Sequence, residues 1–298
     1  MKSIINTIFT AAAVIGLIGC AAAPDNSEAR APEPQSELQA EQPPDIQPNE
    51  ATGDLSIYCF KIGKADAFLF QTENGSVLLD CGEDDDADEI VEYLEDNNID
   101  SLDYIIISHF DKDHVGGAAE VLNSVSIGAV ITPNYTETND EYKAFIAALK
   151  SNGVSQTALS DTYTFTLDDV SFALLPPLSS DYSEEKDNNS SLALSVFHGE
   201  NSFFFTGDAM DERIAELLSY GDISHTLLKM PHHGIYSDGL KALVEAVSPQ
   251  YAIITSSDKN PEDEKTLALL ENEGVETYLT REGDISILSD GKTISIKQ

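Results

Sequence analysis

Four side chains that commonly bind metal ions fall within six positions of this 298-residue chain: His109, Asp111, Asp113 and His114. They follow residues 104–107, an apolar run typical of a buried strand that ends where the polar residues begin. Gly116 and Gly117 come next and would let a helix start close to the sheet. Mixed nitrogen and oxygen donors suit Zn, Mn or Fe better than Ca or Mg. The alternative is a polar turn whose acids cap the next helix.

Two later stretches repeat this pattern of a strand that ends in candidate ligands. The strand predicted at 202–206 leads into Asp208, and the segment 225–234 ends in His232 and His233. Asp208 also precedes a predicted helix, so it could instead be the N-cap of that helix. Lys229, in the same segment, either stabilises charge in the site or only flanks its strand. Since every candidate follows a predicted strand, we expect one polar cleft at a sheet edge.

These three stretches together resemble the site motifs of the metallo-β-lactamase superfamily. The first is similar to S-H-x-H-x-D-H-x-G-G, with Asp111 in place of the second His. That variant is associated with the soluble domain of ComEC-type DNA-uptake proteins and with its stand-alone hydrolase relatives. The Thr-Gly-Asp at 206–208 and the K-x-P-H-H-G at 229–234 match further motifs, and the resemblance extends over residues 55–297.

The resemblance implies a site with two divalent metal ions, Zn or Mn. Asp113, His114 and either His232 or His233 would hold one ion. His109 and Asp111 would hold the other, and the carboxylate of Asp208 would bridge the two. Asp113, Asp208 and His233 are the residues expected to take part in catalysis, in which a metal-bound hydroxide attacks the substrate.

Three residues are secondary candidates for the site: Asn188, Asn189 and Lys229. The superfamily usually supplies another His before Asp208, and this chain has the Asn-rich 188–192 there instead. An amide oxygen is a poor ligand for Zn, so we expect the ion at His109 to be the weaker one. By resemblance, Asp80 is a structural residue that braces the metal loop.

Strand and helix patterns alternate along the chain, and the resemblance implies an α/β (α+β) αββα sandwich of two mixed β-sheets flanked by helices. The predicted segments also include a hairpin at 162–175, a polar loop at 178–189, a turn containing His198 and a strand that starts at His225. The other predicted strands are 55–62, 66–71, 76–80, 128–132, 250–254, 276–280, 284–288 and 293–297. The predicted helices are 87–98, 115–124, 139–151, 209–220, 237–247 and 261–274.

The N-terminal region predicts export and attachment to a membrane. Residues 1–20 resemble a lipoprotein signal peptide that ends in Leu-Ile-Gly-Cys, with Cys20 as the lipidated residue. Residues 21–53 are rich in Pro, Glu, Gln and Ala, a composition that predicts a disordered linker. We therefore expect an extracytoplasmic hydrolase domain at 54–298, lipid-anchored to a bacterial membrane. A plain signal peptide with an incidental cysteine is the alternative.

The charge of the chain is strongly acidic, at −37. Residues 1–53 hold 7 of the 53 acids and 2 of the 16 bases, which leaves about −32 on the predicted domain. Such a field attracts divalent cations and disfavours nucleic acid as a partner, although many secreted proteins have solvated acidic surfaces. Cys59 and Cys81 could form a disulfide or remain buried thiols.

The predicted function is that of a metal-dependent hydrolase, most consistent with a phosphodiesterase or nuclease-like enzyme. The expected substrate is a small molecule or a phosphodiester, and the oligomeric state is open. One alternative is β-lactam or ester hydrolysis at the same site, disfavoured because the three-His site usual for lactamases is reduced to His109. The other is a non-catalytic surface-binding lipoprotein with a degraded site.

Overall fold

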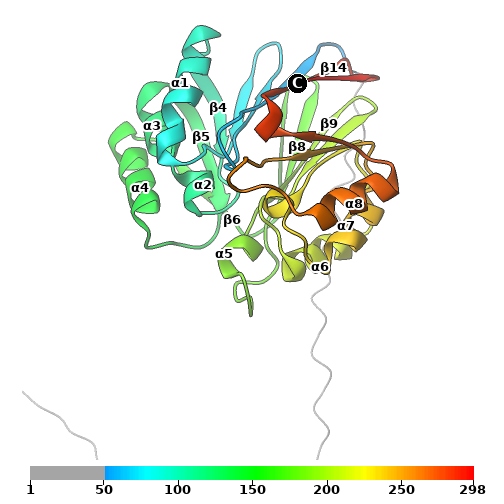
Figure 1. The fold of residues 1–298 in the computed structure, drawn as a ribbon. Helices are drawn as coiled ribbons and strands as arrows, with labels where there is room; N and C mark the ends of the chain where they lie inside the picture. Colours follow the sequence, from blue (N-terminus) through cyan, green and yellow to red (C-terminus); the bar gives the residue numbers. More distant parts are fainter. Residues whose placement is uncertain (1–50) are drawn as a thin grey trace, which may run out of the picture. The chain divides into compact units, whose positions relative to one another are not determined.

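The computed structural model describes residues 51–298 (Figure 1). The predicted signal peptide, Cys20 and all but the last three residues of the predicted linker lie outside the described residues. At the start of the described chain, the N–H of Gly53 donates to a carboxylate oxygen of Asp169, 3.1 Å away.

Two mixed β-sheets form the centre of the domain, which confirms the predicted fold class. The first sheet has the order β15-β14-β1-β2-β3-β4-β5-β6. Neighbouring strands are antiparallel from β15 to β3 and parallel from β3 to β6. Its strands are β1 (Leu55–Cys59), β2 (Phe68–Gln71), β3 (Ser76–Leu79), β4 (Ser101–Ile106), β5 (Ser126–Pro133), β6 (Gln156–Leu159), β14 (Ile285–Ser289) and β15 (Ile294–Lys297).

The second sheet has the order β13-β12-β11-β10-β9-β8-β7. In this sheet, neighbouring strands are antiparallel from β7 to β10 and parallel from β10 to β13. Its strands are β7 (Tyr163–Leu167), β8 (Val170–Leu175), β9 (Ala193–His198), β10 (Asn201–Phe205), β11 (Leu227–Lys229), β12 (Tyr251–Ile254) and β13 (Glu276–Leu279).

Helices cover the outer face of each sheet, as Figure 1 shows. Beside the first sheet lie α1 (Ala87–Asp96), α2 (Lys112–Val115), α3 (Ala118–Ser124) and α4 (Asp140–Asn152). Beside the second lie α6 (Asp211–Ser219), α7 (Leu240–Val247) and α8 (Glu264–Glu273). None of the helices within residues 51–298 is long and apolar enough to cross a membrane.

Three apolar layers hold the domain together. The middle layer joins the two sheets, where Phe68 and Phe70 pack edge-on against Phe205 with ring centroids 5.0 and 5.1 Å apart. One outer layer joins the first sheet to α1, α3 and α4, and the other joins the second sheet to α6, α7 and α8. Burial of both faces of each sheet explains why the central strands are apolar throughout.

The structure corrects four local predictions. The helix predicted at 115–124 is two helices, since α2 already begins at Lys112 and the chain breaks at Gly116 and Gly117. The predicted polar loop at 178–189 ends in the short helix α5 (Lys186–Asn189), and β6 was not predicted. His198 is the buried last residue of β9 rather than a turn residue. Of the two alternatives left open for Cys59 and Cys81, the structure has the free, buried thiols.

Candidate metal centre

The ends of three strands bring the predicted ligands together. The loop after β4 leads to Asp113 and His114, β10 leads to Asp208, and β11 leads to His233 through the 3₁₀ turn η2 (Pro231–Gly234). One ligand atom from each of these four residues lies within 4.8 Å of the others, and all four side chains are buried. Strand β4 belongs to the first sheet, and the parallel neighbours β10 and β11 belong to the second. Because the two sheets pack face to face, residues 120 positions apart that follow these strands meet in one cluster.

The ligand atoms of this cluster lie close enough together to bind the same metal ion. Nε2 of His233 lies 3.1 Å from Oδ2 of Asp113 and 3.1 Å from Oδ2 of Asp208. Nε2 of His114 lies 3.3 Å from the same Asp208 oxygen. Burial alone would raise the pKa of Asp208, but the neighbouring His233 and His114 hold it well below its usual range. The Asp208 carboxylate is therefore ionised and faces both imidazoles.

Asp80 orients His114 from behind, as the sequence predicted for a brace of the metal loop. Its carboxylate accepts hydrogen bonds from Nδ1 of His114 at 2.9 Å and from both the N–H and the hydroxyl of Ser108 at 2.7 Å. A carboxylate on Nδ1 fixes the tautomer that leaves Nε2 free as a ligand. Asp80 adopts a left-handed backbone conformation with φ at 58°, a strained geometry for a non-glycine residue.

The structure distinguishes the two consecutive histidines. Nδ1 of His233 lies 3.0 Å from Oγ1 of the buried Thr255, at the end of β12, and its Nε2 faces the cluster. His232 turns away, and its Nδ1 lies 3.1 Å from the sulfur of Met210. Both histidines have positive φ angles, 46° and 55°, which is how adjacent side chains diverge. The geometry thus favours His233 as the ligand of the pair.

Asp208 is not the N-cap of the following helix. The carboxamide oxygen of Asn189 instead accepts the N–H groups of Met210 and Arg213, at 3.1 and 3.0 Å, at the start of α6. The Asp208 N–H donates to the hydroxyl of Ser191, 3.1 Å away. Asn189, a secondary ligand candidate, therefore uses its oxygen for capping, and the carboxylate of Asp208 remains available to the site.

Glycine is required next to Asp208. Gly207 has φ at +54°, and a Cβ there would lie 2.8 Å from the side chain of Ser191. Gly117 allows the predicted close approach of α3 to the sheet, because a Cβ would come within 2.2 Å of the Cys81 carbonyl oxygen.

A buried lysine lies within the site. Nζ of Lys229 is 2.5 Å from Oδ2 of Asp66, 3.5 Å from Oδ1 of Asp208, and donates to the Gly207 carbonyl at 3.2 Å. Burial would lower the pKa of Lys229, but the charges of Asp66 and Asp208 outweigh it and raise the pKa. Lys229 thus stays charged and holds one oxygen of Asp208, while the other oxygen faces the histidines. Bridging of two ions by Asp208 stays a prediction.

A second lysine approaches the cluster from the β1–β2 connection. Nζ of Lys64 contacts Oδ2 of Asp113, and its side chain remains 31% exposed. Burial would raise the pKa of Asp113, but the hydrogen bond from His233 and the nearby His114 lower it well below the ordinary value. Lys64 is therefore a cation at the solvent side of an ionised ligand. The sequence analysis did not assign Lys64 a role, because a single lysine in a loop has no pattern that would place it beside Asp113.

His109 and Asp111 form a separate, less complete position. The His109 and His114 rings lie with centroids 4.0 Å apart and are tilted by 49°, while Nε2 of His109 lies 3.6 Å from Oδ2 of Asp111. Burial and then the charge of Asp111 raise the pKa of Asp187 in helix α5. Within the described chain, the buried Nε2 of His109 and the buried Oδ1 of Asn188 have no hydrogen-bond partner. Both are free donor atoms for an ion.

The residues present fit divalent metal ions. Five carboxylates gather here and only two lysines oppose them, so cations would neutralise the excess charge. The cluster around His114 supplies two imidazoles and two carboxylates, a donor set for Zn, Mn or Fe. His109 and Asp111 supply a smaller set. These five carboxylates are Asp66, Asp80, Asp111, Asp113 and Asp208.

Comparison with known proteins identifies the same region. The model of the metallo-beta-lactamase superfamily matches residues 62–256. ComE operon protein 3 of Bacillus subtilis is 26% identical over 195 residues, which cover 64% of this chain and 25% of that protein. Recombination protein 2 of Haemophilus influenzae is 31% identical over 176 residues, covering 58% and 20%. Competence protein ComA of Neisseria gonorrhoeae is 27% identical over 211 residues, covering 70% and 28%. The chain thus spans about a quarter of the length of these relatives.

Solved structures share the fold. The metallo-beta-lactamase fold protein YhfI of Bacillus subtilis superposes with a TM-score of 0.53 at 12% identity, covering 82% of this chain and all of that one. Tm1679, a metal-dependent hydrolase of the beta-lactamase superfamily, gives 0.53 at 15% identity and covers 78% of this chain and 98% of that one.

Proposed function

The chain belongs to the metallo-beta-lactamase superfamily, and on that premise we propose that it is a metal-dependent phosphodiesterase with two metal positions. The observation that carries the proposal is the buried cluster of Asp113, His114, Asp208 and His233, whose ligand atoms all lie within 4.8 Å of one another. Divalent ions bound there would activate a water molecule and stabilise negative charge on phosphorus oxygens.

The balance of donors supports a phosphodiester rather than a β-lactam or carboxylic ester. Asp111 stands where the resembling motif has its second histidine, so the metal position formed by His109 and Asp111 has His109 as its one histidine. A site rich in carboxylate oxygen favours harder ions such as Mn, which also bind phosphate oxygens well. In a strongly acidic protein, bound cations would also be needed to admit an anionic substrate.

The residues of the chain itself would prepare the site in three ways. Asp80 and Thr255 fix the orientation of His114 and His233, so that both Nε2 atoms face the substrate side of the cluster. The buried ammonium of Lys229, 3.5 Å from Oδ1 of Asp208, holds this carboxylate in place. Lys64, at the solvent side of Asp113, would exchange its carboxylate partner for a phosphate oxygen when substrate enters.

Metal content and turnover test the proposal together. Purified protein reconstituted with Mn or Zn should bind two equivalents and hydrolyse bis-p-nitrophenyl phosphate faster than it hydrolyses a chromogenic β-lactam. Protein that binds no metal would instead support the non-catalytic binding lipoprotein. Protein that binds metal but prefers the β-lactam would support the acyl-hydrolase alternative.

We also propose that the enzyme acts outside the cytoplasm, tethered by lipid on Cys20. The support is the Leu-Ile-Gly-Cys sequence followed by the Pro- and Glu-rich linker, both outside the described residues except at 51–53. In bacteria fed radiolabelled palmitate, the wild type should incorporate label and Cys20→Ser should not. Equal label in both would contradict the lipid anchor.

A further inference from the structure

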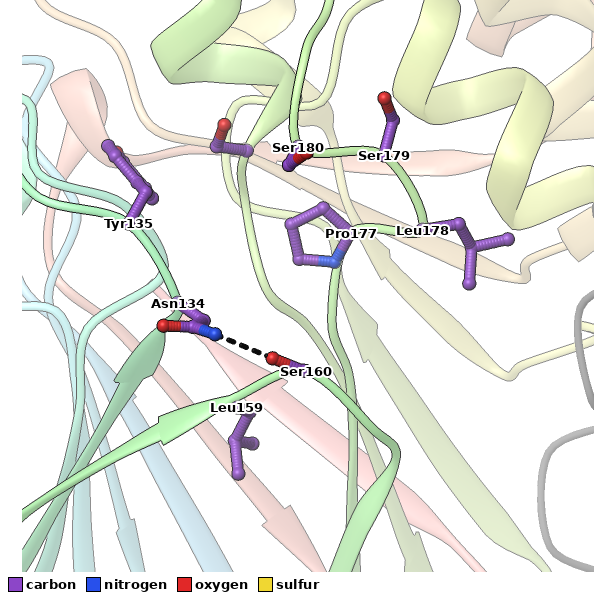
Figure 2. A pocket seen from close by; sticks show the side chains of 9 residues that line it. Asn134, Tyr135, Leu159, Ser160, Pro177, Leu178, Ser179 and Ser180 are labelled. Atoms are coloured by element: carbon purple, nitrogen blue, oxygen red, sulfur yellow. Dashed lines mark hydrogen bonds between the residues drawn. The ribbon is translucent and has the colours of Figure 1, made fainter. Parts of the chain in front are cut away.

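A small pocket lies beside the metal centre. It has a volume of about 220 Å³, below the range of pockets that enclose a whole drug-sized ligand, so it suits one part of a substrate. Four segments form it: the chain after β5, the end of β6, the loop that follows β8, and Ser190 at the end of α5. Figure 2 shows the labelled residues of the first three. Its wall residues are Asn134, Tyr135, Leu159, Ser160, Pro177, Leu178, Ser179, Ser180 and Ser190.

Two residues of the pocket wall connect it to the loops that carry the candidate ligands. The hydroxyl oxygen of Tyr135 accepts the N–H of Phe110, 2.9 Å away, and Phe110 lies between the candidate ligands His109 and Asp111. Ser190, another wall residue, precedes Ser191, whose hydroxyl accepts the N–H of Asp208. The pocket is therefore linked through Phe110 to His109 and Asp111, and through Ser191 to Asp208.

The chemistry of the wall is unusual for this protein. In a chain with a net charge of −37, none of the nine described wall residues carries an acidic or basic side chain. Leu159, Pro177 and Leu178 provide apolar contacts, whereas Asn134 and the serines provide hydrogen-bonding groups. Burial also raises the pKa of Tyr135, which keeps its hydroxyl protonated and uncharged.

Several wall hydroxyls can donate a hydrogen bond to a ligand. The Ser160 oxygen accepts from Nδ2 of Asn134 at 2.7 Å and so keeps its own hydrogen available, as Figure 2 shows. The Tyr135 oxygen likewise accepts from Phe110 and retains its hydrogen. Ser180 is exposed at the rim. A wall with apolar patches and hydroxyl donors matches an uncharged ring with apolar faces and oxygen or nitrogen acceptors on its edge.

From this arrangement we infer that the pocket binds the uncharged ring attached to the scissile phosphate, either the base of a nucleoside or a sugar. The inference rests on the proposed phosphodiesterase function and names its substrate class. The phosphate would lie on the metal centre, and the ring would occupy the pocket between Tyr135 and Ser180.

Three chromogenic esters test this inference by their KM values. They are p-nitrophenyl esters of thymidine 5′-phosphate, of glucose 6-phosphate and of ethyl phosphate, which has no ring. We expect one of the two ring esters to have a KM about tenfold below that of the ethyl ester, the effect of roughly one or two hydrogen bonds. If the thymidine ester alone has a lower KM than the ethyl ester, the pocket binds a base. If the glucose ester has a lower KM than the ethyl ester, the pocket binds a sugar. Equal KM values for all three would overturn the inference.

Variants of the wall locate the effect. Ser180→Phe should fill the pocket and remove the tenfold KM advantage of the ring ester over the ethyl ester. Ser286→Phe, at an exposed position of β14 that is not part of the wall, should keep the advantage. Asn134→Leu, a second variant that removes polar groups from the wall, should reduce the advantage in the same way. An undiminished advantage in both wall variants would contradict the assignment of this pocket.

A binding measurement separates failure of the inference from failure of the proposed hydrolysis. Saturation-transfer NMR on the chelator-treated full chain, with thymidine and methyl glucoside as probes, requires no activity. Binding of one probe that Ser180→Phe abolishes would support the pocket even if no ester were hydrolysed. Hydrolysis of the ethyl ester without binding of either probe would retain the phosphodiesterase and refute the pocket.

Discussion

The hydrogen bond between Thr255 and His233 offers a direct test of which histidine binds metal. Thr255→Val replaces the hydroxyl by a methyl group of nearly the same size and removes the partner of Nδ1 at 3.0 Å. The next acceptor, Oδ1 of Asp66, is 3.6 Å away, too far for a good replacement. The imidazole would then lose the contact that fixes its tautomer and ring orientation.

Loss of such an outer partner typically lowers metal affinity 10- to 100-fold, or about 1.4 to 2.7 kcal/mol. We expect Thr255→Val to fall in this range for the tighter ion. The lost hydrogen bond should also lower the free energy of unfolding of the metal-free protein by about 1 kcal/mol. The two effects are separable because metal affinity and metal-free stability are measured independently.

Thr266→Val is the matched control. Thr266 is a buried threonine like Thr255, but its hydroxyl has no hydrogen-bond partner within residues 51–298. Replacing it should leave metal affinity unchanged and should not destabilise the protein.

The assay is competition for Zn or Mn with a chelating dye at fixed pH, together with urea unfolding of chelator-treated samples. If Thr255→Val bound metal as tightly as the wild type and Thr266→Val, His233 would not be the ligand oriented by Thr255. His232 would then be the better candidate, although it contacts Met210 in this structure.

Three further predictions follow from the site and its surroundings. Asp208→Ala should abolish hydrolysis and weaken the binding of both metal ions. Asn189→Ala should lower the free energy of unfolding by about 1 kcal/mol and leave the metal content unchanged. Metal analysis combined with urea unfolding distinguishes the two outcomes. Chelator titration should remove the ion at His109 and Asp111 first, and one cooperative release would contradict unequal positions. Burial lowers the pKa of His225 to about 4, so as pH falls from about 6.5 to about 4 it should cost about 1.4 kcal/mol of stability per pH unit. In the metal-free His225→Asn variant, the loss of stability that His225 causes between about pH 6.5 and pH 4 should be missing. Identical unfolding free energies of the metal-free wild type and variant at every pH would refute this prediction.

The sign of the His225 effect follows from its surroundings. The ring stacks on Phe204 with centroids 4.8 Å apart, and Nδ1 lies 2.9 Å from the carbonyl oxygen of Ile223. Burial disfavours the charged imidazolium in the folded state, so the unfolded chain takes up the proton first. Stability is therefore complete above about pH 6.5 and declines toward pH 4.

Local sequence was sufficient for much of this structure. Apolar runs, glycines and turn residues predicted most strands and helices, because burial of both faces of a strand imposes a continuous apolar pattern. The spacing of His109, Asp111, Asp113 and His114 predicted the metal loop. Asp208 and the His232–His233 pair were recognised because each follows a strand.

Weak local signals were missed or misjudged. Strand β6 is short and its residues are mostly exposed, so its pattern does not differ from that of a loop. Helix α5 consists of four polar residues and depends on contacts with α6, where Asn189 caps the helix start. His198 has turn residues on one side, but it is buried in the fold, where Nδ1 lies 2.8 Å from the hydroxyl oxygen of Ser289, 91 positions away.

Roles within the site were decided by tertiary contacts. The choice between His232 and His233 depends on two left-handed backbone angles and on Thr255, which only the neighbouring strand supplies. Lys229 reads as part of a strand in the sequence, yet the first sheet places Asp66 against its ammonium. Sequence by itself determined which residue types follow each strand, since that information is local. Only the packing of two sheets decided which of those side chains face one another, because such contacts join residues distant in the chain.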